Sequence, residues 1–133
     1  MSQENVELVK QLWDAFQRGD IEWMVQRCAP DVVIAQPPET PDATVYEGRT
    51  ALIEAVEGFP RDWEAFRLDL REVLDVSDDV VLSVCRNRGR GRISGLEMDM
   101  DMFYVHRIHA GKMDRMQIFL SREQALRAAG LNV

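Results

Sequence analysis

The stretch from Arg86 to Leu120 constrains the fold most, because two glycine-containing turns divide it into three strand-like segments. Ser94-Gly95 and Ala110-Gly111 each place glycine where a two-residue hairpin loop requires a positive φ angle. Around the first turn, charged and uncharged side chains alternate with the period of a β-strand. The stretch therefore predicts a three-stranded antiparallel meander whose register follows from the two turns.

The first turn pairs basic with acidic side chains on one side of the sheet. With Ser94-Gly95 as the loop, three opposite-charge pairs form: Arg92 with Glu97, Arg90 with Asp99 and Arg88 with Asp101. A slip of one residue would break all three pairs, so the register is well specified. The other side carries small residues opposite long ones, namely Gly91, Gly89, Asn87, Cys85 and Ser83 opposite Met98, Met100, Met102, Tyr104 and His106. Because this arrangement leaves space, we expect that side to form the wall of a pocket.

The second turn brings further groups to the pocket side. With Ala110-Gly111 as the loop, the third strand adds three pairs: His106 with Arg115, Tyr104 with Gln117 and Met102 with Phe119. A few polar groups on an apolar concave surface are typical of a small-molecule site. We therefore expect a small hydrophobic ligand, with contacts from Trp13, Cys85, Asn87, Met98, Met100, Met102, Gln117 and Phe119. For Trp13 and the methionine row, packing in the core is the alternative.

The opposite side of the sheet combines the charged pairs with an apolar patch. The patch consists of Val84, Phe103, Val105, Met116 and Ile118. Exposed ion pairs are stable in water, whereas a contiguous apolar patch is typical of a protein interface. The sequence therefore predicts a homodimer that forms through this outer face.

The bulk properties exclude several classes of partner. The formal net charge of −7 in 133 residues argues against binding to nucleic acids or membranes. No apolar run approaches the roughly 20 residues that span a bilayer, and no stretch has the pattern of a signal peptide. Cys28 and Cys85 are in no metal-like spacing, which is typical of buried thiols in a reducing cytoplasm. We expect a single cytoplasmic domain over residues 1–133.

Helical periodicity surrounds the meander. It predicts helices over the ranges 3–17, 21–29, 50–57 and 124–129. Ser2 is the expected N-cap of the first helix, Pro30 ends the second, and Gly58 with Pro60 ends the third. Short strands are expected at 31–35 and 66–70. This order is typical of an α+β protein in which helices cover one face of a curved antiparallel sheet.

Prolines mark a loop between the first strand and the third helix. Pro37, Pro38 and Pro41 exclude regular structure as far as about Thr44. Such a loop beside a cavity is either a rim or lid of the site or a plain surface connection. The sequence leaves both interpretations open.

Short motifs along nearly the whole chain resemble those of one known family. They are Ala15-Phe16 with Arg18-Gly19-Asp20, Ala29-Pro30-Asp31-Val32, Tyr46-Glu47-Gly48-Arg49, Gly111-Lys112 and the closing stretch from Glu123 to Leu131. Together with the order of elements, they resemble a SnoaL-like, ketosteroid-isomerase-like member of the nuclear-transport-factor-two-like superfamily. The resemblance implies a cone-shaped, cystatin-like α+β barrel of order α-α-β-α-β-β-β-β-α, commonly a homodimer. It leaves the activity open, because this fold hosts isomerases, cyclases, dehydratases, hydrolases and binding proteins.

The catalytic residues of the family do not carry over to this chain. The carboxylate base of the similar polyketide cyclases falls at Tyr104, which is not a carboxylate. The strand acids Glu97, Asp99 and Asp101 lie on the outer face in the predicted register. Neither the cyclase nor the isomerase activity is therefore assigned from the resemblance.

His106 is the sharpest candidate for catalysis, because histidine is a common general base near neutral pH. The expected neighbour Arg115 would disfavour the imidazolium, and it could instead hold a substrate carboxylate. Tyr104 and Gln117 would donate hydrogen bonds to a developing oxyanion. The alternative for His106 is a buried structural hydrogen-bond network, and the sequence does not rank the two.

Three function hypotheses follow. The first is an isomerase or lyase that performs acid–base chemistry on a small apolar carbonyl compound through His106, Tyr104 and Arg115. It implies no cofactor, since no glycine-rich phosphate loop follows a strand. No metal is expected, because His106 and His109 point to opposite faces of a strand. The second hypothesis is a non-catalytic dimeric module that binds a hydrophobic ligand or a partner chain. The third is a plain scaffold, in which the methionine row fills the interior and leaves no cavity.

Overall fold

The computed structural model describes residues 3–40 and 44–131; the expected N-cap Ser2 and the proline at position 41 lie outside them. The described residues form four helices and six strands. They are α1 (Gln3–Arg18), α2 (Ile21–Gln26), β1 (Cys28–Ala35), β2 (Val45–Glu47), α3 (Arg49–Asp62), β3 (Trp63–Asp75), β4 (Val80–Gly91), β5 (Glu97–His109), β6 (Lys112–Phe119) and α4 (Arg122–Ala128).

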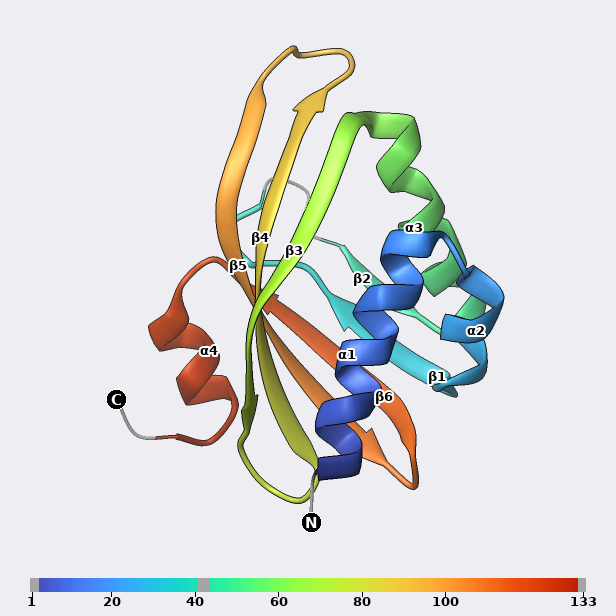
Figure 1. The fold of residues 1–133 in the computed structure, drawn as a ribbon, viewed down its shortest axis with the longest axis vertical. Coiled ribbons are helices and arrows are strands. Elements are labelled where there is room, and N and C mark those ends of the chain that lie inside the picture. The colour runs from blue at the N-terminus through green and yellow to red at the C-terminus, as the bar shows by residue number, and fades with distance from the viewer. Residues whose placement is uncertain (1–2, 41–43, 132–133) are drawn as a thin grey trace.

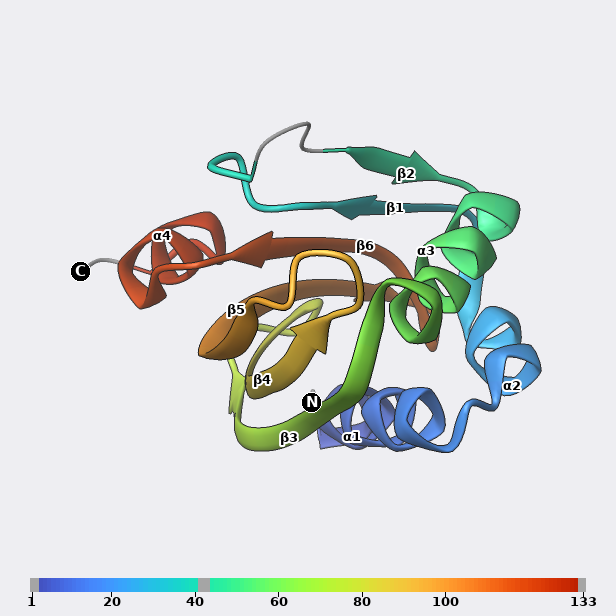
Figure 2. The ribbon, with the colours of Figure 1, turned by 90° about the horizontal axis from the view of Figure 1, so that it is seen from above.

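The six strands form one curved sheet in the order β2-β1-β6-β5-β4-β3. Helices α1, α2 and α3 lie on its concave side and α4 lies on the other (Figure 1; Figure 2). This arrangement confirms the predicted α+β class and cone-like shape. Three details differ: α4 covers the opposite face from the other helices, a short strand, β2, precedes α3, and β1 pairs with β6 in parallel.

Two prolines that were expected to end helices lie inside other elements. Pro30 belongs to β1, within the register shift between Cys28 and Val33, where the strand lacks a regular ladder partner. Its missing N–H therefore costs no sheet hydrogen bond. Helix α3 continues through Pro60 to Asp62. There the β4–β5 loop satisfies terminal carbonyls, because the Arg92 backbone N–H donates to Asp62 O at 3.0 Å and its Nε donates to Pro60 O at 3.0 Å.

The β4–β5 hairpin has the predicted faces but not the predicted partners. Its loop spans residues 92–96, so the observed pairs are Arg90 with Glu97, Arg88 with Asp99 and Arg86 with Asp101. The register thus differs from the prediction by two residues. A shift of two keeps every side chain on its face. The charged residues still share the outer face, where Arg90 and Glu97 approach to 2.6 Å.

The β5–β6 hairpin has the predicted turn, but a bulge follows it. Ile108 pairs with Met113 as expected, and then the register shifts by one residue so that Arg107 pairs with Arg115 and His106 with Met116. One extra residue reverses the two faces of the bulged strand. The predicted pairs of His106 with Arg115, Tyr104 with Gln117 and Met102 with Phe119 are therefore wrong.

The predicted dimer patch is divided between the two faces of the sheet. Val84, Phe103 and Val105 are 3%, 8% and 5% exposed, and they pack in a small core with Ala125 of α4. The terminal helix of the same chain thus covers them. Met116 and Ile118 pack against the main core on the concave side, because the bulge reverses their direction. These five residues do not form a common outer patch.

A membrane-spanning helix is absent from residues 3–40 and 44–131, where no helix combines the necessary length and apolar character.

Candidate functional site

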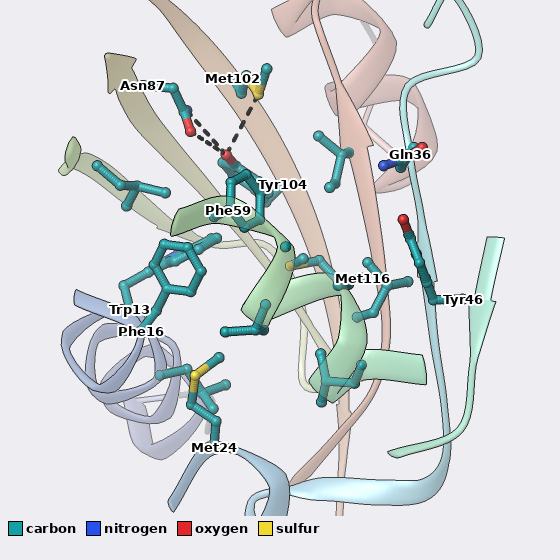
Figure 3. A pocket seen from close by; sticks show the side chains of 18 of the residues that line it. Trp13, Phe16, Met24, Gln36, Tyr46, Phe59, Asn87, Met102, Tyr104 and Met116 are labelled. Atoms are coloured by element: carbon teal, nitrogen blue, oxygen red, sulfur yellow. Dashed lines mark hydrogen bonds between the residues drawn. The ribbon is translucent and has the colours of Figure 1, made fainter. Parts of the chain in front are cut away.

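A cavity of about 390 Å³ opens between the concave face of the sheet and the helices that cover it. Most of its wall is apolar. Leu12, Trp13 and Phe16 come from α1, Leu52, Val56 and Phe59 from α3, and Leu68, Met98, Met102, Met113, Met116 and Ile118 from the sheet. Figure 3 shows Trp13 and Phe16 on one wall, with Gln36, Tyr46 and Met116 across from them. The concave side of the sheet thus borders an open, largely apolar space.

Tyr104 and Asn87 form a buried polar pair on the cavity wall (Figure 3). The Asn87 Nδ2 group donates to the Tyr104 hydroxyl at 3.1 Å and to the Cys85 carbonyl at 3.1 Å. The two residues are 4% and 3% exposed. Burial raises the pKa of Tyr104 above its ordinary value, so the hydroxyl keeps its proton near neutral pH.

Among residues 3–40 and 44–131, the Tyr104 proton has only weak acceptors. One is Asn87 Oδ1 at 3.4 Å, and the other is the Met102 thioether sulfur at 3.7 Å. Both contacts are at the long end of hydrogen bonding, and a thioether is a poor acceptor. The hydroxyl oxygen accepts from Asn87, whereas its proton is engaged only by these two weak contacts.

His106 belongs to a closed hydrogen-bond chain beside this pair. The Trp13 Nε1–H donates to Ser83 Oγ at 3.0 Å, and Ser83 Oγ lies 2.8 Å from His106 Nε2. The His106 Nδ1 atom lies 3.3 Å from the Met113 sulfur. If Ser83 donates to Nε2 and Nδ1–H donates to the sulfur, every member of the chain is satisfied.

The closed chain favours a neutral His106. Burial alone lowers its pKa to about 3, and the predicted neighbour Arg115 contributes nothing, since it faces the other way. Both ring nitrogens have partners within the protein. This bonding resembles the structural alternative more closely than a base aimed at a ligand.

The other predicted site residues fall into two groups. Trp13, Asn87, Met98, Met102, Tyr104 and His106 line the cavity. Cys85, Met100, Arg115, Gln117 and Phe119 are not part of its wall. Cys85 is fully buried in the core behind it. Arg115, Gln117 and Phe119 occupy outer-face positions because of the β6 bulge, so no arginine from β6 reaches the ligand space.

Several lining residues were not predicted. Met116 and Ile118 enter through the bulge, for which the sequence carries no signal. Tyr46 follows the proline loop, and its place in the Tyr46-Glu47-Gly48-Arg49 motif was the available clue. Glu54 lies between the apolar positions expected for the third helix. Because it is charged, the sequence pattern did not indicate that it lines the cavity.

The proline loop borders the cavity. Gln36, Pro37 and Thr40 belong to the lining. The Gln36 backbone N–H donates to Thr44 O at 3.2 Å, and the Thr44 backbone N–H donates to Gln36 Oε1 at 2.9 Å. The described part of the loop is thus a rim of the cavity, one of the two interpretations that the sequence left open.

Neither cysteine thiol is expected to be reactive as a thiolate. Burial raises the pKa of Cys28 to about 11 and that of Cys85 to about 12, so both remain protonated near neutral pH. Across residues 3–40 and 44–131, no three histidine, cysteine or acidic side chains gather as a metal site would require.

Known proteins share this fold at low sequence identity. An NTF2-like protein of Burkholderia xenovorans LB400 superposes with a TM-score of 0.78 at 23% identity, covering 96% of each chain. TerC, co-crystallised with polyporic acid, gives 0.77 at 19% identity, covering 96% of this chain and 99% of TerC. A protein of Jannaschia sp. CCS1, assigned to the SnoaL-like polyketide cyclases, gives 0.75 at 18% identity, covering 95% of this chain and 90% of that one.

The sequence itself identifies the family. A comparison with curated proteins finds no match. The family model of the SnoaL-like domain, however, matches residues 9–116, which include most of α1, all of β4 and β5, the first part of β6 and most of the cavity wall. The match agrees with the resemblance that the motifs carry. This chain belongs to the SnoaL-like domain family.

Proposed function

We propose that this protein binds a small, largely apolar carbonyl compound, and that the Tyr104 hydroxyl donates a hydrogen bond to the carbonyl oxygen. One observation carries the proposal: Asn87 supplies the Tyr104 oxygen with a donor, while the Tyr104 proton lacks a strong acceptor. A ligand carbonyl would complete the pair.

The shape and composition of the cavity support a ligand with a flat ring. A volume of about 390 Å³ lies within the range of small-molecule pockets. Trp13 and Tyr104 meet edge to face with ring centroids 4.7 Å apart, and Phe16 meets Phe59 in the same way at 5.5 Å. Aromatic edges and thioethers contact ring systems favourably. TerC, which has the same fold, was co-crystallised with polyporic acid, and this supports a small-molecule role in general.

Two matched probes test the proposal. The first is 2-acetylnaphthalene and the second is 2-ethylnaphthalene, which has the same ring but no carbonyl. We expect the wild type to bind the ketone about fivefold to tenfold more tightly in isothermal titration calorimetry, as one additional hydrogen bond provides. Tyr104→Phe should remove this preference while the hydrocarbon still binds.

Tyr46→Phe is the matched control, because Tyr46 also lines the cavity but has no contact with Asn87. It should keep the preference for the ketone. Absence of binding for both probes would contradict a ligand site of this chemistry. A preference that survives Tyr104→Phe would contradict the role of the hydroxyl.

Acid–base chemistry on the carbonyl compound is the second candidate. It is favoured by the same donor, because a protonated hydroxyl in an apolar cavity can stabilise an enolate. The test is exchange of the methyl protons of 2-acetylnaphthalene in D₂O, followed by proton NMR. If His106 is the base, His106→Gln abolishes catalysed exchange and spares binding. Absence of catalysed exchange in the wild type would leave ligand binding as the function.

Homodimer formation also remains a proposal, although not through the five residues expected from the sequence. The proposal is supported by half-buried positions on the outer face of β1 and β6. Among them are Val33, Ala35 and Gln117. Sedimentation velocity at micromolar concentration should give a dimer, and Ala35→Glu should give a monomer. A wild-type monomer would contradict the proposal. The cytoplasmic location stays a prediction, which fractionation of cells can test.

A further inference from the structure

We infer that the ligand carries a cationic group, which meets the Glu54 carboxylate at the mouth of the cavity while the carbonyl meets Tyr104. This inference rests on the proposed function and adds the charge class of the ligand. It predicts a molecule with an apolar body, an acceptor at the buried end and an ammonium group at the open end.

Glu54 is a carboxylate without a partner at the edge of an apolar cavity. It lies on α3, contributes to the cavity wall and is exposed to solvent. No hydrogen bond or ion pair to Glu54 occurs among residues 3–40 and 44–131. Its neighbours Leu52, Ala55 and Val56 line the same wall with apolar groups. A ligand in the cavity would therefore bring its open end close to this charge.

The other charged residues of the lining compensate each other. Arg61 and Asp62 lie at the C-terminal end of α3, with Arg61 Nε at 3.6 Å from Asp62 Oδ1. The Arg61 guanidinium also lies along its own helix, since a Cβ placed on Gly58 would come within 3.1 Å of its Nη2 atom. Arg61 is thus already paired, and the uncompensated charge of the lining is that of Glu54.

Among the described residues, the rim formed by the proline loop and Tyr46 contributes no cation to the lining. Gln36, Thr40 and Tyr46 form the described part of that side and are uncharged. The net charge of −7 adds a long-range preference for cations over anions at this opening. Local and global electrostatics therefore favour the same class of ligand.

Three ketones of nearly equal size test the inference. They are 2-acetylnaphthalene, its 6-aminomethyl derivative as the cation, and 6-acetyl-2-naphthoate as the anion. We expect the wild type to bind the cation about threefold to tenfold more tightly than the anion at low salt, as one solvent-exposed carboxylate can provide. The difference should shrink in 0.5 M salt, because exposed charges are screened at about that concentration.

Glu54→Gln should bring the affinities for cation and anion together. Glu57→Gln is the matched control, because Glu57 is exposed on the same helix but does not line the cavity. It removes the same charge and should keep the preference. An anion that binds as tightly as the cation in the wild type would overturn the inference, as would an equal effect of the two variants. Failure of the neutral ketone to bind would instead overturn the proposed function.

Discussion

Two polar groups of strand β5, only two residues apart, differ in whether the protein satisfies them. His106 is part of a chain in which Trp13, Ser83 and Met113 occupy every donor and acceptor. Tyr104 receives a hydrogen bond from Asn87, and its own proton has no strong acceptor. A closed network of this kind stabilises the fold, whereas an open one is available to a ligand. The comparison teaches that burial of a polar residue is not itself a sign of function.

The largest expected effect on the closed chain comes from removing its indole. Trp13→Ala deletes a buried ring that touches Tyr104 and Phe16 and leaves Ser83 without its donor. We expect a loss of about 3–5 kcal/mol in the free energy of unfolding, measured by urea titration. Tyr104→Phe, which removes one hydroxyl from the open pair, should cost less, about 1–2 kcal/mol, because Asn87 Nδ2 keeps its hydrogen bond to the Cys85 carbonyl. Equal losses would contradict the distinction between the two networks.

Acid should destabilise the protein through His106. Its pKa is about 3 in the folded chain and about 6.5 when unfolded, so the unfolded chain binds the additional proton below pH 6.5. Stability is therefore unaffected by this group above pH 6.5 and is lost as the pH falls towards 3. The expected loss is about 1.4 kcal/mol per pH unit, or about 2–3 kcal/mol between pH 6.5 and 4.5.

The matched variant for this measurement is His106→Gln, which has no imidazole to titrate. Its unfolding free energy should fall less steeply over the same pH range. Subtracting the two profiles removes the contribution of surface carboxylates such as Asp99, whose pKa Arg86 lowers. Parallel profiles would show that His106 is not held neutral by burial.

A smaller effect is expected at the centre of the closed chain. Ser83→Ala leaves the Trp13 N–H and the His106 Nε2 atom without their shared partner. We expect a loss of about 1–3 kcal/mol in the free energy of unfolding. The affinity ratio between 2-acetylnaphthalene and 2-ethylnaphthalene should stay unchanged, because Ser83 is fully buried and does not line the cavity. A changed ratio would show that the two networks are coupled.

The sequence predicted the fold class and one wall of the site, and the two hairpins show where such reasoning ends. An error of two residues at the β4–β5 loop left every face correct, because side chains alternate with a period of two. A bulge of one residue in β6 reversed the faces of that strand. Met116 and Ile118 therefore line the cavity in place of Arg115 and Gln117, which the sequence had placed there. The turn at Ala110-Gly111 was predicted correctly and gave no warning, since the bulge follows it.

The helix ends that were missed depend on contacts between distant segments. Arg92 in the β4–β5 loop supports the end of α3 beyond Pro60, and no local signal announces that contact. Tyr46 and Gln36 reach the cavity because β1 and β2 pair beside β6. Local propensity predicts helices and strands well, but it carries no information about contacts between segments that are distant in the sequence.

The vibrational frequency of a bound carbonyl tests the central claim most directly. Infrared difference spectra of 2-acetylnaphthalene, labelled with ¹³C at the carbonyl, report whether its oxygen accepts a hydrogen bond in the cavity. The account predicts a carbonyl stretch in the wild-type complex that is shifted to lower frequency relative to the Tyr104→Phe complex. Identical carbonyl frequencies in the two complexes would contradict the role of the Tyr104 hydroxyl, provided that the wild type and Tyr104→Phe both bind the ketone.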